Sequence, residues 1–412
     1  MAGFVIENIG MLATPMGTAA KYGEGQGEVS IMRDAWISVS DGFIEGVGSG
    51  AVPKAENTFD AGGGLVTPGL VDPHTHLVFG GWREHELAMK LRDVPYLDIL
   101  AAGGGILSTV RSTRAASEAE LIDKAMLVLE RMLALGVTTC EAKSGYGLSL
   151  DDELKLLRAA VKLDEMQPID IVRTFMGAHA VPPEYIDDRD AYVDLVVDKM
   201  IPAAAGMAEY CDVFCETGAF TVEETRRILL SAKDAGLRPK CHSDEINAIG
   251  GTEMAAEIGA VSCEHLICVE PAGIEAMSRH GTIACCLPAT SFYLNAAYAP
   301  ARAMISAGIP VAFGSDFNPG SCPTYSLQLA MNIGCYKYRM TPEECLTAVT
   351  LNAAAAIGRA AIVGSVEVGK KADILIWDAP NLEQICYRFG DNLVRSVFKN
   401  GELRSGATSH VK

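Results

Sequence analysis

The chain has 412 residues, of which 49% are hydrophobic and 21% are charged, and its formal net charge is −18. Single hydrophobic cores stop growing at roughly 250–300 residues, so we expect one large domain and a smaller one. The negative charge argues against a nucleic-acid-binding protein, which needs a concentrated positive surface, and no apolar run reaches the ~18 residues of a membrane helix. The twelve cysteines contain no CxxC pair, which indicates buried, reduced thiols in a cytoplasmic protein.

Short runs rich in Val, Ile, Thr and Cys alternate with amphipathic stretches through the middle of the chain. We predict eight strands, around residues 70–76, 136–143, 170–179, 211–216, 238–242, 261–266, 282–287 and 310–316. Helices are expected at 117–136, 151–166 and 221–236; the first begins with a capping box, Ser117 and Glu120, and the last closes on a glycine.

Eight strand–helix units over roughly 250 residues are the number that a closed (β/α)8 barrel needs. An open, doubly wound sheet is the alternative. Such a sheet usually carries a glycine-rich phosphate turn after its first strand, and this sequence shows none. The two ends of the chain instead alternate strands with tight turns. The dipeptides Asp41-Gly42 and Asn400-Gly401 are typical of two-residue hairpins.

Polar residues gather at the carboxyl ends of the predicted strands, where barrels carry their functional groups. Five of the eight histidines end strands, and one acidic residue joins them: His74, His76, His179, His242, His265 and Asp316. Residues i and i+2 of a strand share a face, so we expect His74 and His76 to point together into the barrel mouth. With His242 and Asp316 they offer three nitrogens and a carboxylate, which suit a divalent ion such as zinc or iron. Such an ion activates water and polarises a carbonyl.

Each of these residues taken alone has a structural explanation. A single HxH pair is weak evidence for a metal site. A lone strand-end histidine is more often a satisfied core residue, and a lone Asp316 would more often cap the next turn. The convergence of polar residues on one end of five strands favours the metal site.

Three residues at or near these strand ends have predicted roles other than binding the metal ion. Glu245 is expected to pass a proton from water to the leaving nitrogen, although it could instead be a charge at a helix N-terminus. His265 is expected to orient the activated water or to stabilise a developing oxyanion. Lys143 is expected to reach toward the barrel edge rather than to bridge a second metal ion.

The long segment 77–116 is a candidate lid or binding loop, with a flexible run at Gly103-Gly104-Gly105. The glycines could instead simply separate two helices. Arg83 lies in the same segment. Its guanidinium would match a carboxylate, and a surface arginine is the alternative.

The segments PGLVDPHTH, CHSDE, CEHL, FGSD and GKKADILIWD resemble the amidohydrolase superfamily across nearly the whole chain. The resemblance implies a (β/α)8 barrel at 67–359 and a small, β-sandwich-like domain assembled from 1–66 and 360–412. More narrowly, HTHLVFGGWRE, EAKSGYGL, TFMGAHAVP and GSDFNPGSCP are similar to the branch that hydrolyses 4-imidazolone-5-propanoate to N-formimidoyl-L-glutamate in histidine degradation.

The same resemblance implies roles for individual residues. One zinc or iron ion would be held by His74, His76, His242 and Asp316. The catalytic residues would be Glu245, His265 and Asp316. Substrate or product would be contacted by Arg83, Tyr146, His179, Glu245, Asn318, Gly320 and Ser321. His179 occupies the position of the bridging lysine of two-metal relatives, which favours a single ion.

The resemblance also implies a cytoplasmic homodimer that acts on a small anionic imidazolone, with no nucleic-acid or membrane partner. Two other functions stay open. The His242-x-x-Glu245 arrangement is similar to that of deaminases of related nitrogen heterocycles, which release ammonia. A non-catalytic barrel that serves as a scaffold is the second, and the complete set of candidate ligands disfavours it.

Overall fold

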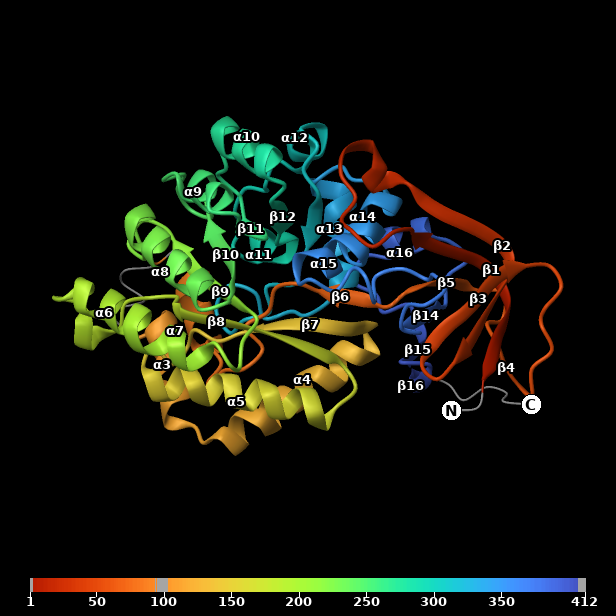
Figure 1. The fold of residues 1–412 in the computed structure, drawn as a ribbon, viewed down its shortest axis with the longest axis horizontal. Helices are drawn as coiled ribbons and strands as arrows, with labels where there is room; N and C mark the ends of the chain where they lie inside the picture. Colours follow the sequence, from red (N-terminus) through yellow and green to blue (C-terminus); the bar gives the residue numbers. More distant parts are fainter. Residues whose placement is uncertain (1–2, 93, 95–102, 407–412) are drawn as a thin grey trace.

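The computed structural model describes residues 3–92, 94 and 103–406. Within these residues the chain forms two eight-stranded sheets. One is a parallel barrel surrounded by helices, and the other is a separate sheet to which both ends of the chain contribute (Figure 1). Part of the candidate lid, residues 93 and 95–102, lies outside the described residues.

The predicted (β/α)8 barrel is confirmed. Its parallel strands follow one another in chain order: β6 (Leu70–Asp72), β7 (Val137–Lys143), β8 (Asp170–Ala178), β9 (Tyr210–Cys215), β10 (Arg238–Ser243), β11 (Ser262–His265), β12 (Ile283–Cys286) and β13 (Val311–Phe313). Seven of the eight agree with the prediction to within three residues at each end, and β6 is shorter than predicted.

The short first strand leaves the two histidines in an extended segment beyond it, and this segment closes the barrel. Thr75 forms a parallel bridge with Phe317. The backbone N–H of Asp316 donates to the carbonyl oxygen of His74 at 3.0 Å, and that of His76 donates to the carbonyl oxygen of Phe317 at 2.9 Å. The first and last strands therefore meet at the histidine pair.

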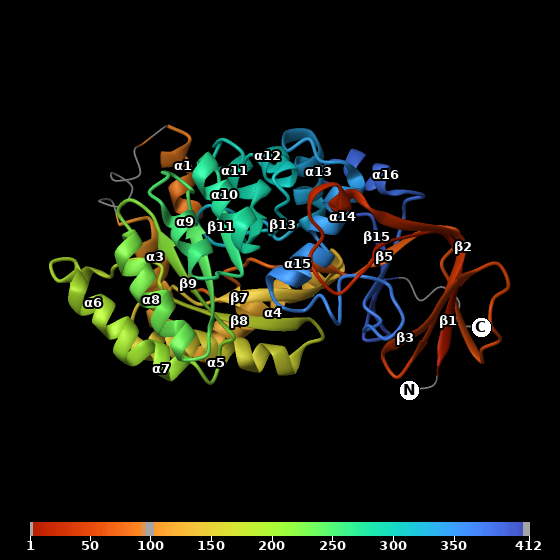
Figure 2. The ribbon, with the colours of Figure 1, turned by 45° about the horizontal axis from the view of Figure 1, so that its top comes forward.

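Helices surround the barrel (Figures 1 and 2). Their bounds are α1 (Leu87–Lys90), α3 (Ile106–Ala115), α4 (Glu118–Ala134), α5 (Leu150–Met166), α6 (Arg189–Leu195), α7 (Ile201–Ala204), α8 (Val222–Asp234), α9 (Gly251–Glu257), α10 (Pro271–His280), α11 (Pro288–Tyr293), α12 (Ala301–Ser306), α13 (Leu327–Lys337), α14 (Pro342–Ala348), α15 (Leu351–Ala356) and α16 (Leu382–Tyr387).

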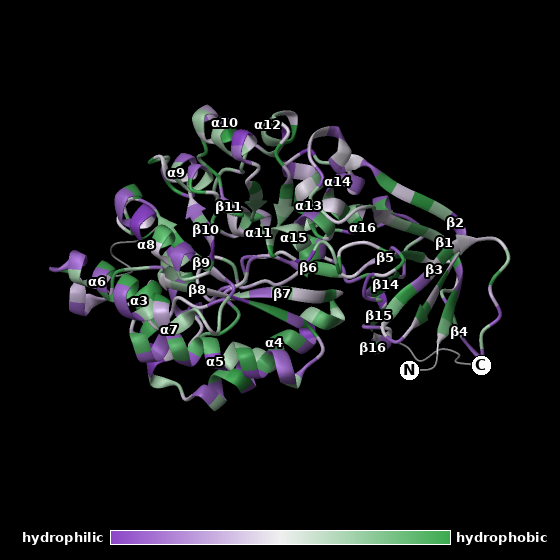
Figure 3. Cartoon of the chain, viewed as in Figure 1, coloured by the Kyte–Doolittle hydropathy of each residue, from purple (hydrophilic) through white to green (hydrophobic). Residues whose placement is uncertain are grey.

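The three predicted helices are present as α4, α5 and α8. The capping box is confirmed, since the Ser117 hydroxyl accepts from the N–H of Glu120 and the Glu120 carboxylate accepts from the N–H of Ser117. Apolar and polar residues mix along α4 and α5 (Figure 3). In α4 the apolar ones recur at Leu121, Ala125 and Leu129, all buried, because a 3.6-residue period places them on one face.

The second sheet combines strands from both ends of the chain in the order β16-β15-β14-β5-β1-β2-β3, with β4 beside β1. Their bounds are β1 (Phe4–Pro15), β2 (Val29–Ser40), β3 (Phe43–Ser49), β4 (Asn57–Asp60), β5 (Leu65–Pro68), β14 (Ile374–Trp377), β15 (Val394–Lys399) and β16 (Glu402–Gly406). The ends join where β5 and β14 pair antiparallel. Both predicted hairpins are present.

The hairpin dipeptides have the backbone geometry that their turns need. Asp41 and Gly42 have φ of 48° and 84°, and Asn400 and Gly401 have φ of 50° and 74°. Positive φ at both central residues is the mark of the hairpin turn that matches strand twist.

No helix among the described residues is both long and apolar enough to cross a membrane.

Candidate metal centre and active site

The four predicted metal ligands lie together at the mouth of the barrel. The ring centroids of His74 and His242 are 4.5 Å apart, and those of His76 and His242 are 5.5 Å apart. One nitrogen from each of the three rings lies within 4.8 Å of the other two. Oδ1 of Asp316 is 3.4 Å from Nε2 of His74 and 3.7 Å from Nε2 of His76. All four residues are buried.

The hydrogen-bonding state of the rings fits a bound cation. Nε2 of His74 and Nε2 of His242 are both buried, and neither makes a hydrogen bond within the described residues. On the other side of each ring Nδ1 meets a carboxylate, Glu264 for His74 and Asp212 for His242, the latter at 2.9 Å. Buried polar atoms in native proteins are nearly always paired. A zinc or iron ion held by three imidazole nitrogens and a carboxylate oxygen would be the missing partner of these nitrogens.

Asp316 is held so that one oxygen faces the histidines. The Thr290 hydroxyl donates to its Oδ2 at 2.7 Å, which leaves Oδ1 directed at the rings. The backbone of Asp316 has φ of 53°, and that of His265, at the end of β11, has φ of 73°. Left-handed backbone at non-glycine residues costs about 1–3 kcal/mol and tends to gather at functional sites.

Glu245 and His265 face each other beside the cluster. Oε1 of Glu245 is 3.6 Å from Nδ1 of His265. Burial, helped by the charges of Asp316 and Glu216, raises the pKa of Glu245 to about 8. Burial lowers the pKa of His265 to about 3. The lowered pKa keeps the imidazole of His265 neutral. The raised pKa of Glu245 gives its carboxyl group a proton affinity suited to accepting a proton and delivering it to a leaving nitrogen near neutral pH.

Two predicted substrate contacts form an aromatic wall next to the histidines. The ring of His179 stacks on that of His76, with centroids 4.9 Å apart and planes 14° apart. The ring of Tyr146 is 5.3 Å from His179 and 5.7 Å from His76. Nδ1 of His179 lies 3.0 Å from the carbonyl oxygen of Gly145. If Nδ1 carries the proton, that bond leaves Nε2 available to a ligand.

Arg83 is mostly buried, with its side chain 10% exposed. Its Nε and Nη2 donate to the two carboxylate oxygens of Glu86, at 2.8 and 3.0 Å. A Cβ placed on Gly320 would lie 2.6 Å from Cζ of Arg83, so only glycine leaves room for the guanidinium there. Lys90 donates to the carbonyl oxygen of Gly320 at 2.9 Å. The Nη1 side of Arg83 thus faces the loop after β13, away from Glu86.

Asn318 uses its amide to shape that loop. Its Oδ1 accepts from the backbone N–H of Gly320 at 2.8 Å and of Ser321 at 2.7 Å. Its Nδ2 donates to the carbonyl oxygen of Asp316 and to the hydroxyl of Ser321. The structure therefore brings Asn318, Gly320 and Ser321 together beside Arg83, while their predicted contacts with substrate or product stay predictions.

The prediction for Lys143 was wrong. The side chain does not reach the barrel edge but is buried, with Nζ 2.6 Å from Oδ2 of Asp212 and 2.9 Å from Oε2 of Glu141. Burial alone would lower the pKa of Lys143, but the neighbouring carboxylates outweigh it and raise the pKa well above its usual value.

Five charged residues form a buried network that the sequence reasoning missed: Glu141, Lys143, Asp212, Lys240 and Glu264. A signal was present. Glu141 and Lys143 are two residues apart in β7, and Lys240 and His242 are two apart in β10. Period-two spacing places such residues on one face of a strand, so charges at alternate positions of apolar runs indicate a polar barrel interior.

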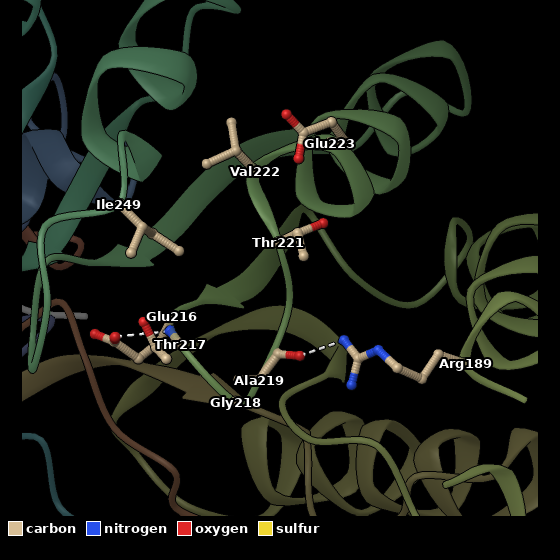
Figure 4. A pocket seen from close by; sticks show the side chains of 9 residues that line it. All are labelled: Arg189, Glu216, Thr217, Gly218, Ala219, Thr221, Val222, Glu223 and Ile249. Carbon is tan, nitrogen blue, oxygen red and sulfur yellow. Dashed lines mark hydrogen bonds between the residues drawn. The ribbon is translucent and has the colours of Figure 1, made fainter. Parts of the chain in front are cut away.

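A separate hollow of about 470 Å³ lies at the rim of the barrel. Figure 4 shows the residues that line it: Arg189, Glu216, Thr217, Gly218, Ala219, Thr221, Val222, Glu223 and Ile249. None of them is a predicted site residue. Glu216 links the hollow to the site, because its Oε2 accepts from the backbone N–H groups of Ile246 and Asn247, just after Glu245. Among the described residues, the groups of side chains that could hold a metal ion lie in and beside the histidine cluster and include none of the residues that line the hollow.

Comparisons with known proteins identify the family of this chain. Residues 65–404 match the amidohydrolase family. An imidazolonepropionase of Alkaliphilus metalliredigens is 50% identical over 413 residues, covering 98% of each chain. One of Fusobacterium nucleatum is 51% identical over 409 residues, again covering 98% of each. The chain belongs to the imidazolonepropionase family of amidohydrolases. Amidohydrolases are metal-dependent, and this one has a histidine-rich site that can bind a metal ion.

Solved structures share the fold of this amidohydrolase at low sequence identity. A triazine hydrolase of Arthrobacter aurescens is 18% identical, with a TM-score of 0.74 and coverage of 98% of this chain and 94% of that one. An adenosine deaminase of Xanthomonas campestris with bound zinc is 17% identical, with a TM-score of 0.70 and coverage of 98% and 93%. Likeness at this level concerns the fold alone.

Proposed function

We propose that this amidohydrolase hydrolyses the ring amide C–N bond of 4-imidazolone-5-propanoate and releases N-formimidoyl-L-glutamate. The observation that carries the proposal is similarity to imidazolonepropionases at about 50% identity along nearly the whole chain. The buried cluster of His74, His76, His242 and Asp316 supports it from the structure.

We further propose that these four residues hold one divalent ion, zinc or iron. Their donor set suits either metal. Nε2 of His74 and of His242 are buried and have no hydrogen-bond partner in the part of the chain that the structure describes. When bound, such an ion supplies Lewis-acid chemistry, making water a nucleophile near neutral pH and polarising a carbonyl.

The protein's own groups would then orient the substrate and transfer a proton from the water to the leaving nitrogen. The Nη1 side of Arg83 would take the propanoate, because it faces away from Glu86. The rings of His179 and Tyr146 would lie against the planar imidazolone. Holding the ring in a fixed pose is a large part of the rate enhancement in such reactions.

Bond breaking would use Glu245 and His265. Water adds its oxygen to the ring carbonyl carbon, and the carbon–nitrogen bond breaks. Glu245 carries the proton from the water to the departing nitrogen, and the neutral His265 stabilises the developing oxyanion. Both nitrogens of the ring stay in the product, and the carbonyl carbon becomes its new carboxylate.

The test is the ultraviolet absorbance of the imidazolone ring during incubation with purified, metal-loaded protein, together with an ammonia assay. The proposal predicts loss of the ring absorbance without ammonia. Ammonia release would point instead to a deaminase of a related heterocycle. Unchanged absorbance with either metal would refute the proposal.

Three further expectations stay predictions: a homodimer, a cytoplasmic location, and a domain division into 1–66 with 360–412 and 67–359. Light scattering after size-exclusion chromatography measures the first directly.

A further inference from the structure

Two lysines lie buried beneath the candidate metal ligands. Nζ of Lys143 is 2.6 Å from Oδ2 of Asp212, 2.9 Å from Oε2 of Glu141 and 3.8 Å from Oε2 of Glu264. Nζ of Lys240 is 2.9 Å from Oε1 of Glu141 and 2.9 Å from Oε1 of Glu264. All five side chains are fully buried. Lys240 also donates to the carbonyl oxygen of Pro73, next to the histidine pair.

Two carboxylates of this buried network touch the candidate ligands. Oε2 of Glu264 contacts Nδ1 of His74. Oδ2 of Asp212 lies 2.9 Å from Nδ1 of His242, and its Oδ1 accepts the backbone N–H of the same histidine at 3.1 Å. A carboxylate at Nδ1 keeps the ring proton there and directs the lone pair of Nε2 outward. Among the described residues, Nε2 of each of these two rings is buried and makes no hydrogen bond.

Stability alone explains this arrangement poorly. Barrel interiors are commonly filled by branched apolar side chains. Exchanging a buried ionic group for well-packed apolar residues is often neutral or stabilising. The lysines do, however, contact the same carboxylates that meet the rings. Lys240 contacts the oxygen of Glu264 that faces away from His74, and Lys143 contacts Oδ2 of Asp212, the oxygen that also faces His242. Both lysines thereby restrict where those carboxylates can lie.

We propose that Lys143 and Lys240 are positioning residues of the metal site, which hold Asp212 and Glu264 against His242 and His74 so that both rings present Nε2 to the ion. The inference rests on the proposed function, because it takes the cluster to be a metal site. Neither lysine touches the substrate or the ion. Each acts through a carboxylate and a ring.

The variant to make is Glu141→Gln combined with Lys240→Met. The wild-type network has two lysines and three carboxylates. The double variant has one lysine and two carboxylates, so the network keeps its excess of one negative charge. Glu141 contacts neither ring, and the Ser262 hydroxyl still donates to Glu264 at 2.6 Å. We expect a folded protein whose zinc affinity is lower by roughly 10- to 100-fold, the usual effect of losing support behind a metal ligand.

A matched control is available in the second sheet. Nζ of Lys399 lies 2.6 Å from Oδ2 of Asp373, with both side chains at most 2% exposed. Lys399→Met combined with Asp373→Asn removes a comparable buried pair far from the histidines in the sequence. This control should leave the zinc affinity unchanged.

Zinc affinity is measured by competition with a chromophoric chelator, and the visible spectrum of the Co²⁺-loaded protein reports the ligand geometry. Unchanged affinity and spectrum in the folded double variant would overturn the proposal, and so would an equal loss in the control. If the double variant does not fold, Glu264→Gln is the second test. A Glu264→Gln protein that binds zinc with wild-type affinity would also overturn the proposal. A wild-type protein that binds zinc tightly but leaves the imidazolone intact refutes the proposed function alone.

Discussion

Gly320→Ala tests whether the position of Arg83 determines substrate binding. The new Cβ would lie 2.6 Å from Cζ of Arg83, whereas carbon atoms in contact sit ~3.5–4.0 Å apart. The guanidinium must therefore move by roughly 1 Å or more. A hydrogen bond to a charged group contributes about 1.5–3 kcal/mol. Losing it would lower kcat/KM roughly 10- to 150-fold for a substrate that carries the propanoate.

The fold should tolerate this change, because the obstructing atoms are the far end of a flexible side chain. We expect the free energy of unfolding to change by less than about 1 kcal/mol. Steady-state kinetics on 4-imidazolone-5-propanoate and on an analogue without the carboxylate give the readout. Gly206→Ala is the matched control, since a Cβ there meets nothing within 4 Å. Equal losses with both substrates, or no loss with either, would show that Arg83 does not hold the propanoate.

Four other predictions follow from the structure. Glu245→Gln should leave metal content unchanged and cut turnover by roughly 10²–10⁴-fold; metal analysis with kinetics checks it, and equal activity would remove Glu245 from the mechanism. Ser117→Ala should lower the free energy of unfolding in urea by about 1 kcal/mol, because it removes the cap of α4; an unchanged midpoint would contradict this. Although burial opposes it, Lys399 and Lys371 lower the pKa of Asp170 below 3.8, so its contribution to stability is present above about pH 4 and fades as the pH falls through the lowered pKa. Asp170→Asn should therefore reduce Tm more at pH 7 than at pH 3, and an equal reduction at both would be evidence against the ion pair. Chelation of the metal should lower Tm, and added zinc or iron should restore it, because a ligand that binds only the folded state stabilises it; a Tm that does not respond to the chelator would argue against a tightly held ion.

Local patterns were enough to predict most of the fold. The capping box at Ser117 and Glu120 and the two hairpin dipeptides involve neighbouring residues, and all are present. The barrel strands followed from apolar runs at regular spacing. The first strand was drawn too long, because the segment after Asp72 pairs with residues 316 and 317, more than 200 positions away. Such a partner is invisible to any local pattern.

The residues at the strand ends of the candidate site were predictable from the sequence, but the buried charged residues beneath them were less so. His74, His76, His242 and Asp316 lie together, as their places at strand ends led us to expect. Lys143 was misjudged because its burial depends on Asp212, which belongs to another strand 69 residues along the chain. The pairing of Arg83 with Glu86, three residues later, could have been predicted from the sequence, since residues at that spacing share a helical face.

The most direct test of the central claim is anomalous X-ray diffraction from crystals of the metal-loaded protein, with data collected on both sides of the zinc and iron absorption edges. The account predicts one anomalous peak per chain, within bonding distance of His74, His76, His242 and Asp316. An active protein with no peak in this cluster, or with its ion bound at other residues, would contradict it.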